Sequence, residues 1–408
     1  MTDRNLTRRA LIKGIGLTAC SAAAHPWLTS VTLAGTGGGQ PLGDHRLVVI
    51  ILRGAMDGLD LVQPLGDPGF AALRPTLGLG TGTHALTDRF ALHGAAGGLM
   101  PLWQAGQLAF VHATSTPYRD QRSHFTGQDL LEAGGGSPAG DGLPRDGWLN
   151  RLLGVVPGLT AETAYAIGVE ALPLLQGDAP TRSWTPDQDL QLSAQARLLM
   201  EHVAHDDALF RDAMEEAFQL TEGEMSGGKV SGDKAARVFA DVDALVDFAA
   251  QRMLGETRIV AFSQTGWDTH RAQGNAIGRP LTRLTRTILR LADQLGPDVW
   301  GKTTVLAITE FGRTVRENGT GGTDHGTGGV MVAAGGAVKG GQVLGTWPGL
   351  READLYDGRD LTPTTDLRAW AALAMQGMFG LDRGVLERTV FPGLDMARTG
   401  GPVSGLIL

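Results

Sequence analysis

The chain has 408 residues, of which 42% are apolar, and its formal net charge is -8. A chain of this length can bury a large core and form one big domain or two. Because 43 Asp and Glu outnumber a scattered set of 35 Lys and Arg, the composition excludes the basic surface that nucleic-acid binding requires. The 60 glycines follow no period, which is typical of many tight turns rather than of a collagen-like chain.

The N-terminus carries a pattern typical of export. Arg8 and Arg9 precede a weakly apolar segment, residues 15–24, which is too short to span a bilayer. This arrangement resembles a twin-arginine signal, which implies the twin-arginine translocase as a partner and a periplasmic or other exported location. A basic tail without structure is the alternative. We expect residues 1–34 to be a signal peptide and residues 35–408 to form a single domain.

The single cysteine, Cys20, lies inside this segment, so the remainder of the chain has no disulfide. Residues 17–20 also resemble the cleavage box of a lipoprotein, which would place a lipid on Cys20. Cleavage after Ala24 or near Ala34 also fits the run of small residues. Beyond residue 35 no stretch is apolar and long enough to span a membrane.

Short apolar runs and amphipathic segments alternate along the rest of the chain. The runs typical of buried strands are Arg46–Leu52, 108–112, 258–262, Thr303–Ile308 and 330–334. The segments with helical spacing are 126–133, 192–222, 236–254 and 280–295. This alternation predicts an α/β fold, with a mostly parallel sheet and helices on both faces. Glycine-rich loops at 135–147 and 222–233 predict a helical insertion over approximately 190–230.

Polar side chains follow the ends of several apolar runs. Asp57 comes after the first run, Asp268 and His270 after the third, and Glu310 after the fourth. Ligands collect at the carboxyl ends of the strands in such sheets, so we expect one site there. An Asp and a His two residues apart on a loop can reach one divalent ion, and this mixed pair suits zinc or manganese. A surface hydrogen bond is the alternative for Asp268 and His270.

Asp324 and His325 repeat these ligand types inside a glycine-rich stretch, residues 319–329. Glycine would let the main chain approach a ligand closely. The alternative is a solvated turn that Asp324 caps while His325 has no role.

Ser123 stands where a helix is expected to begin. The unpaired N–H groups and the dipole of a helix start favour negative charge. Its hydroxyl is either an N-cap or a nucleophile, and the same N–H groups would stabilise the anion attached to a nucleophile. Arg122 and Arg313 would add charge-assisted contacts to an anionic substrate.

The order of these residues resembles the alkaline phosphatase and sulfatase superfamily, and within it the twin-arginine-exported DUF1501 family. The resemblance runs over nearly the whole chain, on the stretches LVVIILRGAMDGLDLVQPLGDP, LRPTLGL, SHFTGQDLLEAG, DGWLNR, GWDTH, TEFGRT and TDHGTGG. It implies an alkaline-phosphatase-like domain, Ser123 as nucleophile, and one divalent metal: zinc, manganese or calcium. The metal ligands that the residues and the resemblance together indicate are Asp57, Asp268, His270, Glu310, Asp324 and His325.

Two positions depart from the superfamily pattern. Phe311 stands where the superfamily has a metal-binding histidine, so a second metal is in doubt. Arg53 stands at the end of the first strand, where the superfamily has an aspartate. An arginine there could neutralise a phosphate or sulfate oxygen, or it could pair with Asp57 and close the site.

The sequence therefore predicts an exported hydrolase of small or polymeric phosphate or sulfate esters. Ser123 would attack, one divalent ion would stabilise charge, and Arg313 and Arg53 would hold anionic oxygens. The alternative is a member without catalysis that binds an envelope polymer or a partner protein, which Phe311 and Arg53 favour. A metal-independent sugar-modifying enzyme is a third interpretation, supported only by the acidic residues.

Overall fold

The computed structural model describes residues 31–32, 42–77, 82–119, 122–136, 143–168, 170–185, 232–397 and 405–408. The predicted helix at 192–222, the predicted insertion at 190–230, Cys20, and all of the predicted signal except residues 31–32 lie outside these ranges. None of the helices within these ranges combines the length and the apolar character needed to cross a membrane.

A ten-stranded sheet forms the centre of the molecule. Along its main path the strands are β1 (Val31–Thr32), β7 (Thr160–Ile167), β9 (Ile259–Gln264), β2 (Arg46–Leu52), β10 (Thr303–Ile308), β11 (Gly329–Ala334), β6 (Leu108–Ser115) and β12 (Gln342–Leu344). Beside this path, β8 (Arg182–Trp184) pairs with β7, and β13 (Thr365–Asp366) pairs with β6. Antiparallel pairing is confined to β11 with its two neighbours and to β1 with β7. The predicted α/β class with a mostly parallel sheet is confirmed.

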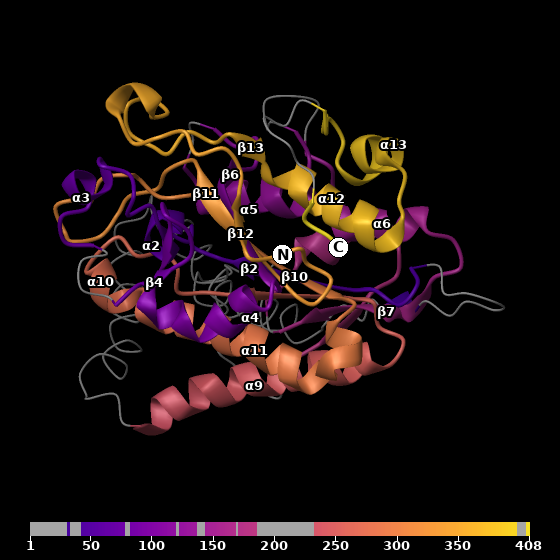
Figure 1. Cartoon of the computed structure of the whole chain (residues 1–408). Helices are drawn as coiled ribbons and strands as arrows, with labels where there is room; N and C mark the ends of the chain where they lie inside the picture. The colour runs from indigo at the N-terminus through magenta and orange to yellow at the C-terminus, as the bar shows by residue number, and fades with distance from the viewer. Residues whose placement is uncertain are drawn as a thin grey trace, which may run out of the picture.

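The central strands are buried on both faces, as their continuous apolar runs predict. In β2, Leu47, Val49 and Ile51 point into one core, and the alternate residues of the same strand point into the other. The first core is closed by α6 (Trp148–Val155) and α12 (Leu367–Phe379), and the second by α9 (Gly232–Leu254) and α11 (Gly278–Trp300). Figure 1 shows these two pairs of helices on opposite sides of the sheet.

Shorter elements complete the described part of the chain. The helices are α2 (Gly58–Leu61), α3 (Phe70–Leu73), α4 (Met100–Gln104), α5 (His124–Ala133), α10 (Gln273–Ala276) and α13 (Arg383–Val385). Short 3₁₀ or π turns are η1 (Gly94–Leu99), η2 (Pro173–Leu175), η3 (Glu352–Asp354) and η4 (Leu386–Val390). A second sheet joins β3 (Val62–Gln63), β5 (Ala91–Leu92) and β4 (His84–Ala85).

Strand directions bring five loops to one edge of the large sheet. β9, β2 and β10 are parallel neighbours, so their carboxyl ends lie together. β11 is antiparallel to β10, so the loop before it enters at that same edge, and β6 ends there because it is antiparallel to β11. Among the described residues, the edge therefore collects the segments 53–57, 116–119 with 122–123, 265–272, 309–315 and 319–328.

Candidate metal centre

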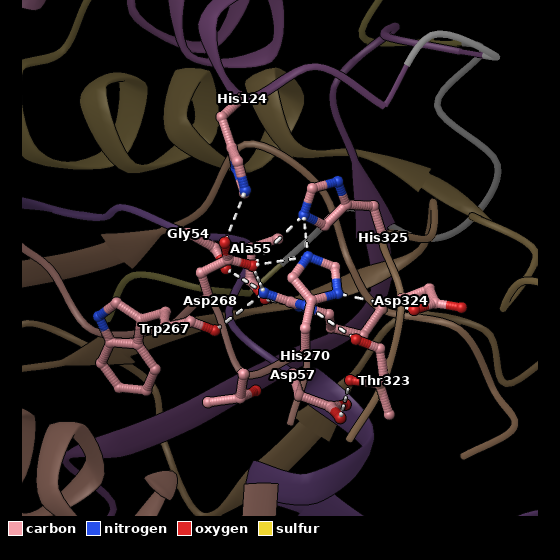
Figure 2. Close-up of polar contacts among 12 residues, drawn as sticks. Gly54, Ala55, Asp57, His124, Trp267, Asp268, His270, Thr323, Asp324 and His325 are labelled. Atoms are coloured by element: carbon pink, nitrogen blue, oxygen red, sulfur yellow. Dashed lines mark hydrogen bonds and ion pairs between the residues drawn. The ribbon is translucent and has the colours of Figure 1, made fainter. Parts of the chain in front are cut away.

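Asp268, in the loop after β9, lies at the centre of three imidazoles (Figure 2). Its Oδ1 is 3.1 Å from Nε2 of His270 and 3.3 Å from Nε2 of His325. Its Oδ2 is 3.5 Å from Nε2 of His124, the first residue of α5. The ligand atoms of His124, Asp268 and His325 all lie within 4.8 Å of one another. The Asp268 side chain is 46% exposed, so the cluster is open to solvent.

Two ring nitrogens in this cluster face each other. Nε2 of His270 lies 2.9 Å from Nε2 of His325. Nδ1 of His325 donates to the carbonyl oxygen of Arg122 at 3.0 Å, which leaves its Nε2 as a bare lone pair in the neutral ring. Burial lowers the pKa of His325 and favours that neutral ring. The 2.9 Å contact therefore places either the N–H of His270 or a cation against this lone pair.

The other two imidazoles are also held at Nδ1. Nδ1 of His124 lies 2.8 Å from the buried carboxylate of Glu310, and Nδ1 of His270 lies 3.6 Å from the exposed carboxylate of Asp324. In metal sites, histidine ligands usually donate one ring N–H to a carboxylate or a carbonyl, which fixes the ring and directs the other nitrogen at the ion. His124 and His325 show this arrangement, and the Nδ1 of His270 faces Asp324 without a hydrogen bond, while the Nε2 atoms of all three rings lie toward Asp268.

The spacing and chemistry of these groups fit a divalent metal. Metal–nitrogen bonds of about 2.0 Å in a tetrahedral site place neighbouring ligand atoms about 3.3 Å apart. The separations from Asp268 to the three Nε2 atoms run from 3.1 to 3.5 Å, close to that value, and the three ligand atoms that lie mutually within 4.8 Å are those of His124, Asp268 and His325. Three imidazoles and one carboxylate form a ligand set suited to zinc or manganese.

The charges in the cluster support each other. Burial raises the pKa of Asp268, but hydrogen bonds from His124 and His270 and the charge of Arg313 hold it well below its usual range. Burial lowers the pKa of His124, but Asp268 and Glu310 outweigh burial and raise it to about 9. A cation at Nε2 of His124, whether a proton or a metal, is therefore stabilised by two carboxylates.

Glu310 supports His124 and does not face the cluster directly. Its Oε1 accepts hydrogen bonds from the main-chain N–H groups of Gly54 and Ala55 and from Nε2 of Gln128, as well as contacting His124. The carboxylate is fully buried, and these donors with His124 hold its pKa low despite burial. Glu310, which was predicted to be a metal ligand, thus contacts Nδ1 of His124 and not the centre of the cluster.

Arg313 holds the loops together. Its side chain is fully buried and pairs with Asp268. It also donates to the carbonyl oxygens of four residues on three loops, which are Gly54, Ala55, Trp267 and Thr323. Because these acceptors and Asp268 engage the buried guanidinium, Arg313 has no free N–H face for a substrate anion. The predicted contact between Arg313 and a substrate is therefore not available in this structure.

Arg53 is also engaged, in a way that the sequence analysis did not anticipate. Its guanidinium lies 2.9 Å from carboxylate oxygens of both Glu132 and Glu170, and it donates to Gln128 at 2.8 Å. It makes no ion pair with Asp57 among the described residues. Two carboxylates already neutralise this cation, so it is not available to a phosphate or sulfate oxygen.

Asp57 lies below the cluster in a closed network. Its Oδ2 accepts from Arg74 at 2.6 Å and from Gln273 at 2.7 Å, and its Oδ1 caps α2 by accepting from the N–H groups of Leu59 and Asp60. Its side chain is 1% exposed. The structure does not bring Asp57 to the cluster, because protein donors occupy both of its carboxylate oxygens.

Phe311 forms an apolar wall of the cluster. Its ring centroid lies 5.3 Å from that of His124 and 5.1 Å from that of His325, and it stacks on Tyr118 at 5.8 Å. A phenyl ring supplies no ligand atom at this position, and the absence of a second metal stays a prediction. The ring also shields one side of the two imidazoles from water.

The glycine-rich loop before β11 packs against protein rather than opening toward a ligand. A Cβ at Gly322 would overlap the carbonyl group of His270, and a Cβ at Gly326 would overlap the main chain of Arg313. Glycine is therefore needed because the loops that carry His270, Arg313 and His325 touch through their main chains.

Ser123 is the N-cap residue of α5, and its side chain makes no capping hydrogen bond. The next residue, His124, is the one that the structure brings into the cluster. His124 was not among the predicted site residues, although it lies in the stretch SHFTGQDLLEAG that carries the family resemblance. The signal that identifies it is its place at the start of a helix that follows β6, a strand that ends at the edge of the site.

A family model described as "Protein of unknown function (DUF1501)" matches residues 78–390. No curated protein matches the chain. A solved structure of a mutant TAB5 alkaline phosphatase with bound Mg is similar at 11% sequence identity and a TM-score of 0.32, over 75% of this chain and 91% of that chain. A similarity of that size does not establish a shared activity.

Proposed function

The chain belongs to the DUF1501 family, and we propose that it is a hydrolase of phosphate or sulfate esters that depends on one divalent metal. The observation that carries the proposal is the convergence of three imidazoles on Asp268, each with its Nδ1 facing an oxygen acceptor. The ligands would be His124, Asp268, His270 and His325. Asp324 and Glu310, which the sequence analysis proposed as ligands, would orient two of these rings.

The ligand set favours zinc or manganese over calcium. Calcium takes six to eight oxygen ligands, whereas this cluster offers mainly imidazole nitrogen. When bound, the ion would supply Lewis-acid stabilisation of negative charge on an ester oxygen.

Ser123 is the proposed nucleophile. It precedes His124 in the chain, and no capping hydrogen bond engages its hydroxyl. Attack would form a bond from the serine oxygen to phosphorus or sulfur as the ester oxygen leaves, and water would then release the anion. The N-terminus of α5 favours the negative charge that the attached group carries.

Arg122 is the cation best suited to contact the substrate. Arg53 and Arg313 are engaged by protein acceptors, whereas the Arg122 side chain is 38% exposed and lies 3.6 Å from Asp360. Its carbonyl oxygen holds the ring of His325, which places its main chain at the cluster. An anionic oxygen could therefore bind Arg122 without breaking a buried ion pair.

The test is turnover of aryl phosphates and aryl sulfates by purified protein with zinc, manganese, magnesium or calcium. We expect turnover with zinc or manganese, and its loss in both Ser123→Ala and His325→Ala. His84→Ala, which removes an exposed imidazole on β4, is the matched control and should retain activity. Absence of turnover with every metal would refute the hydrolase. Full activity in Ser123→Ala would refute the nucleophile alone.

A second candidate function is binding without catalysis, of an envelope polymer or a partner protein. The observation that favours it is the complete engagement of Arg53 and Arg313, the two cations predicted to hold substrate oxygens. Metal analysis of protein purified from cells separates the two functions. A retained ion at one per chain supports the hydrolase, and a metal-free protein that binds polymer supports the alternative.

Export by the twin-arginine route is part of the proposal, and the paired arginines of the sequence support it. Replacement of Arg8 and Arg9 by Lys should retain the protein in the cytoplasm on cell fractionation. A lipid on Cys20 would instead appear as membrane-bound protein that Cys20→Ser releases. Export of the Lys variant at the normal level would contradict this route.

A further inference from the structure

A cavity of about 170 Å³ lies at the carboxyl ends of β7 and β9, where α9 and α11 cover the sheet. Its apolar wall includes Ile167, Val242, Leu245 and Phe262. An engineered apolar cavity of about 150 Å³ binds benzene, so this space accommodates one small ring or a short acyl chain. None of its lining residues belongs to the metal cluster, although the loop that lines it continues to Asp268.

Arg283 brings a positive charge to this cavity without a carboxylate partner. Among the described residues, its guanidinium makes no hydrogen bond or ion pair, and burial lowers its pKa. Its neighbours on α11 behave differently. Arg286 and Arg290 pair with Asp243 and Asp247 of α9 at 2.5 and 2.6 Å. A partly buried arginine without a partner is costly, and an anion in the cavity would offset that cost.

Gln264 supplies a second unpaired group on the same wall. Its side chain is 5% exposed, and its Nε2 donates to the hydroxyl of Thr287 at 2.8 Å. Its Oε1 has no hydrogen-bond partner. A buried amide oxygen without a donor is uncommon, because its desolvation is not compensated. It would accept a hydrogen bond from a hydroxyl or an N–H group of a ligand, or from a water bound beside one.

The cavity also contains a carboxylate, Glu170, but Arg283 is not its partner. Glu170 lies 2.9 Å from Arg53 and accepts from the hydroxyl of Ser263 at 2.6 Å. The described structure contains no ion pair between Glu170 and Arg283. Glu170 is thus engaged by Arg53 and Ser263, and among the described residues no carboxylate pairs with Arg283 on the wall of the cavity.

We propose that this cavity binds a small organic anion, with its carboxylate or phosphonate-like group on Arg283 and its apolar body against Phe262 and Leu245. Arg283 offers a planar pair of donors to anionic oxygens, and the apolar wall selects an organic body over a bare inorganic ion. This site goes beyond the proposed hydrolysis, since none of its groups takes part in the metal centre.

The test is isothermal titration calorimetry of the full chain with benzoate and with phenylphosphonate. We expect at least one of them to bind at one per chain, and Arg283→Gln to weaken it by about tenfold or more, as for a lost charge-assisted hydrogen bond. Arg283→Lys should weaken binding less. Arg286→Gln, one turn along α11 and outside the cavity, is the matched control and should bind as the unchanged protein does.

Further ligands and variants decide between the remaining outcomes. Val242→Phe should fill the cavity and abolish binding while Arg283 is intact, which keeps the test informative if Arg283→Gln fails to fold. His325→Ala should bind benzoate normally, so failure of the metal site does not count against the cavity. The proposal is overturned if neither anion binds. Two further results would also overturn it. Benzyl alcohol binding as tightly as benzoate would show that the anionic group is not needed, and inorganic phosphate binding as tightly as phenylphosphonate would show that the apolar body is not needed.

Discussion

Asp57 and Asp268 are both carboxylates at the ends of neighbouring strands, and both were expected to hold a metal. Asp57 is 1% exposed and accepts from Arg74, Gln273 and two main-chain N–H groups. Asp268 is 46% exposed and faces the Nε2 atoms of three imidazoles. Asp57 is enclosed by donors of the surrounding protein, whereas Asp268 is open to solvent and faces imidazole nitrogens that can bind a divalent cation. Exposure and the type of partner therefore separate a structural acid from a candidate binding acid when position does not.

The same isosteric change at both positions tests this contrast. Asp57→Asn leaves the fully buried Arg74 without its carboxylate, and removal of one partner of a buried pair costs about 3–5 kcal/mol. We expect the free energy of unfolding to fall by that amount in urea denaturation, while the folded protein retains its metal. Loss of metal with unchanged stability would show that Asp57 is a ligand after all.

Asp268→Asn should give the reverse pattern. It removes the central carboxylate but preserves an oxygen that Arg313 can contact, so the free energy of unfolding should fall less than in Asp57→Asn. Metal affinity should fall by more than about 100-fold, a larger loss than for groups outside the ligand set. Metal content after dialysis, read beside circular dichroism, checks both points. An Asp268→Asn variant that loses as much stability as Asp57→Asn but retains its metal after dialysis would reverse the assignments of the two acids.

Glu310→Gln sharpens the contrast within the cluster. Glutamine keeps an oxygen for the N–H groups of Gly54 and Ala55 and loses only the charge that faces His124. Metal affinity should fall by about 10–100-fold, as for other groups that orient a histidine ligand. Competition with a chromogenic chelator measures the loss. An unchanged affinity would mean that His124 does not bind the ion.

Asp324→Ala should have the smallest effect. Asp324 is 54% exposed and 3.6 Å from Nδ1 of His270, so solvent screens the contact. Metal affinity should fall by less than about tenfold, and salt should narrow the difference from the unchanged protein. The same chelator titration at low and high ionic strength checks this. A loss equal to that of Asp268→Asn would make Asp324 a ligand.

Much of the fold was predictable from short-range pattern. β2 and β10 begin and end where their apolar runs do, because strands buried on both faces need apolar residues at every position. The sequence analysis missed β7, whose stretch TAETAYAI has a half-buried first part and no continuous apolar run. It also stopped α11 at residue 295. The helical segment resumes after Gly296, which has φ 64°, and continues to Trp300.

The candidate site was predictable only in part. Asp268, His270 and His325 come together because strand ends share an edge, a consequence of topology that a sequence can reveal. The roles of Arg53 and Asp57 depend on partners far along the chain, such as Glu132 and Gln273, and no local pattern indicates those pairings. His124 was missed for a related reason. The neighbouring hydroxyl of Ser123 carries the more familiar chemistry, and only the packing of α5 shows that the side chain of His124 reaches the cluster.

The direct contact between the loops at Gly322 and Gly326 bears on the ion selectivity of the proposed metal site. Because the main chains of these loops touch, the loops have little room to move, and the ring nitrogens of His270 and His325 would keep their spacing before an ion binds. A preorganised cage loses little conformational entropy on binding, and it discriminates between ions by radius and preferred coordination instead of adapting to each. An added methyl group at Gly322 would widen the gap between the loops and relax that discrimination.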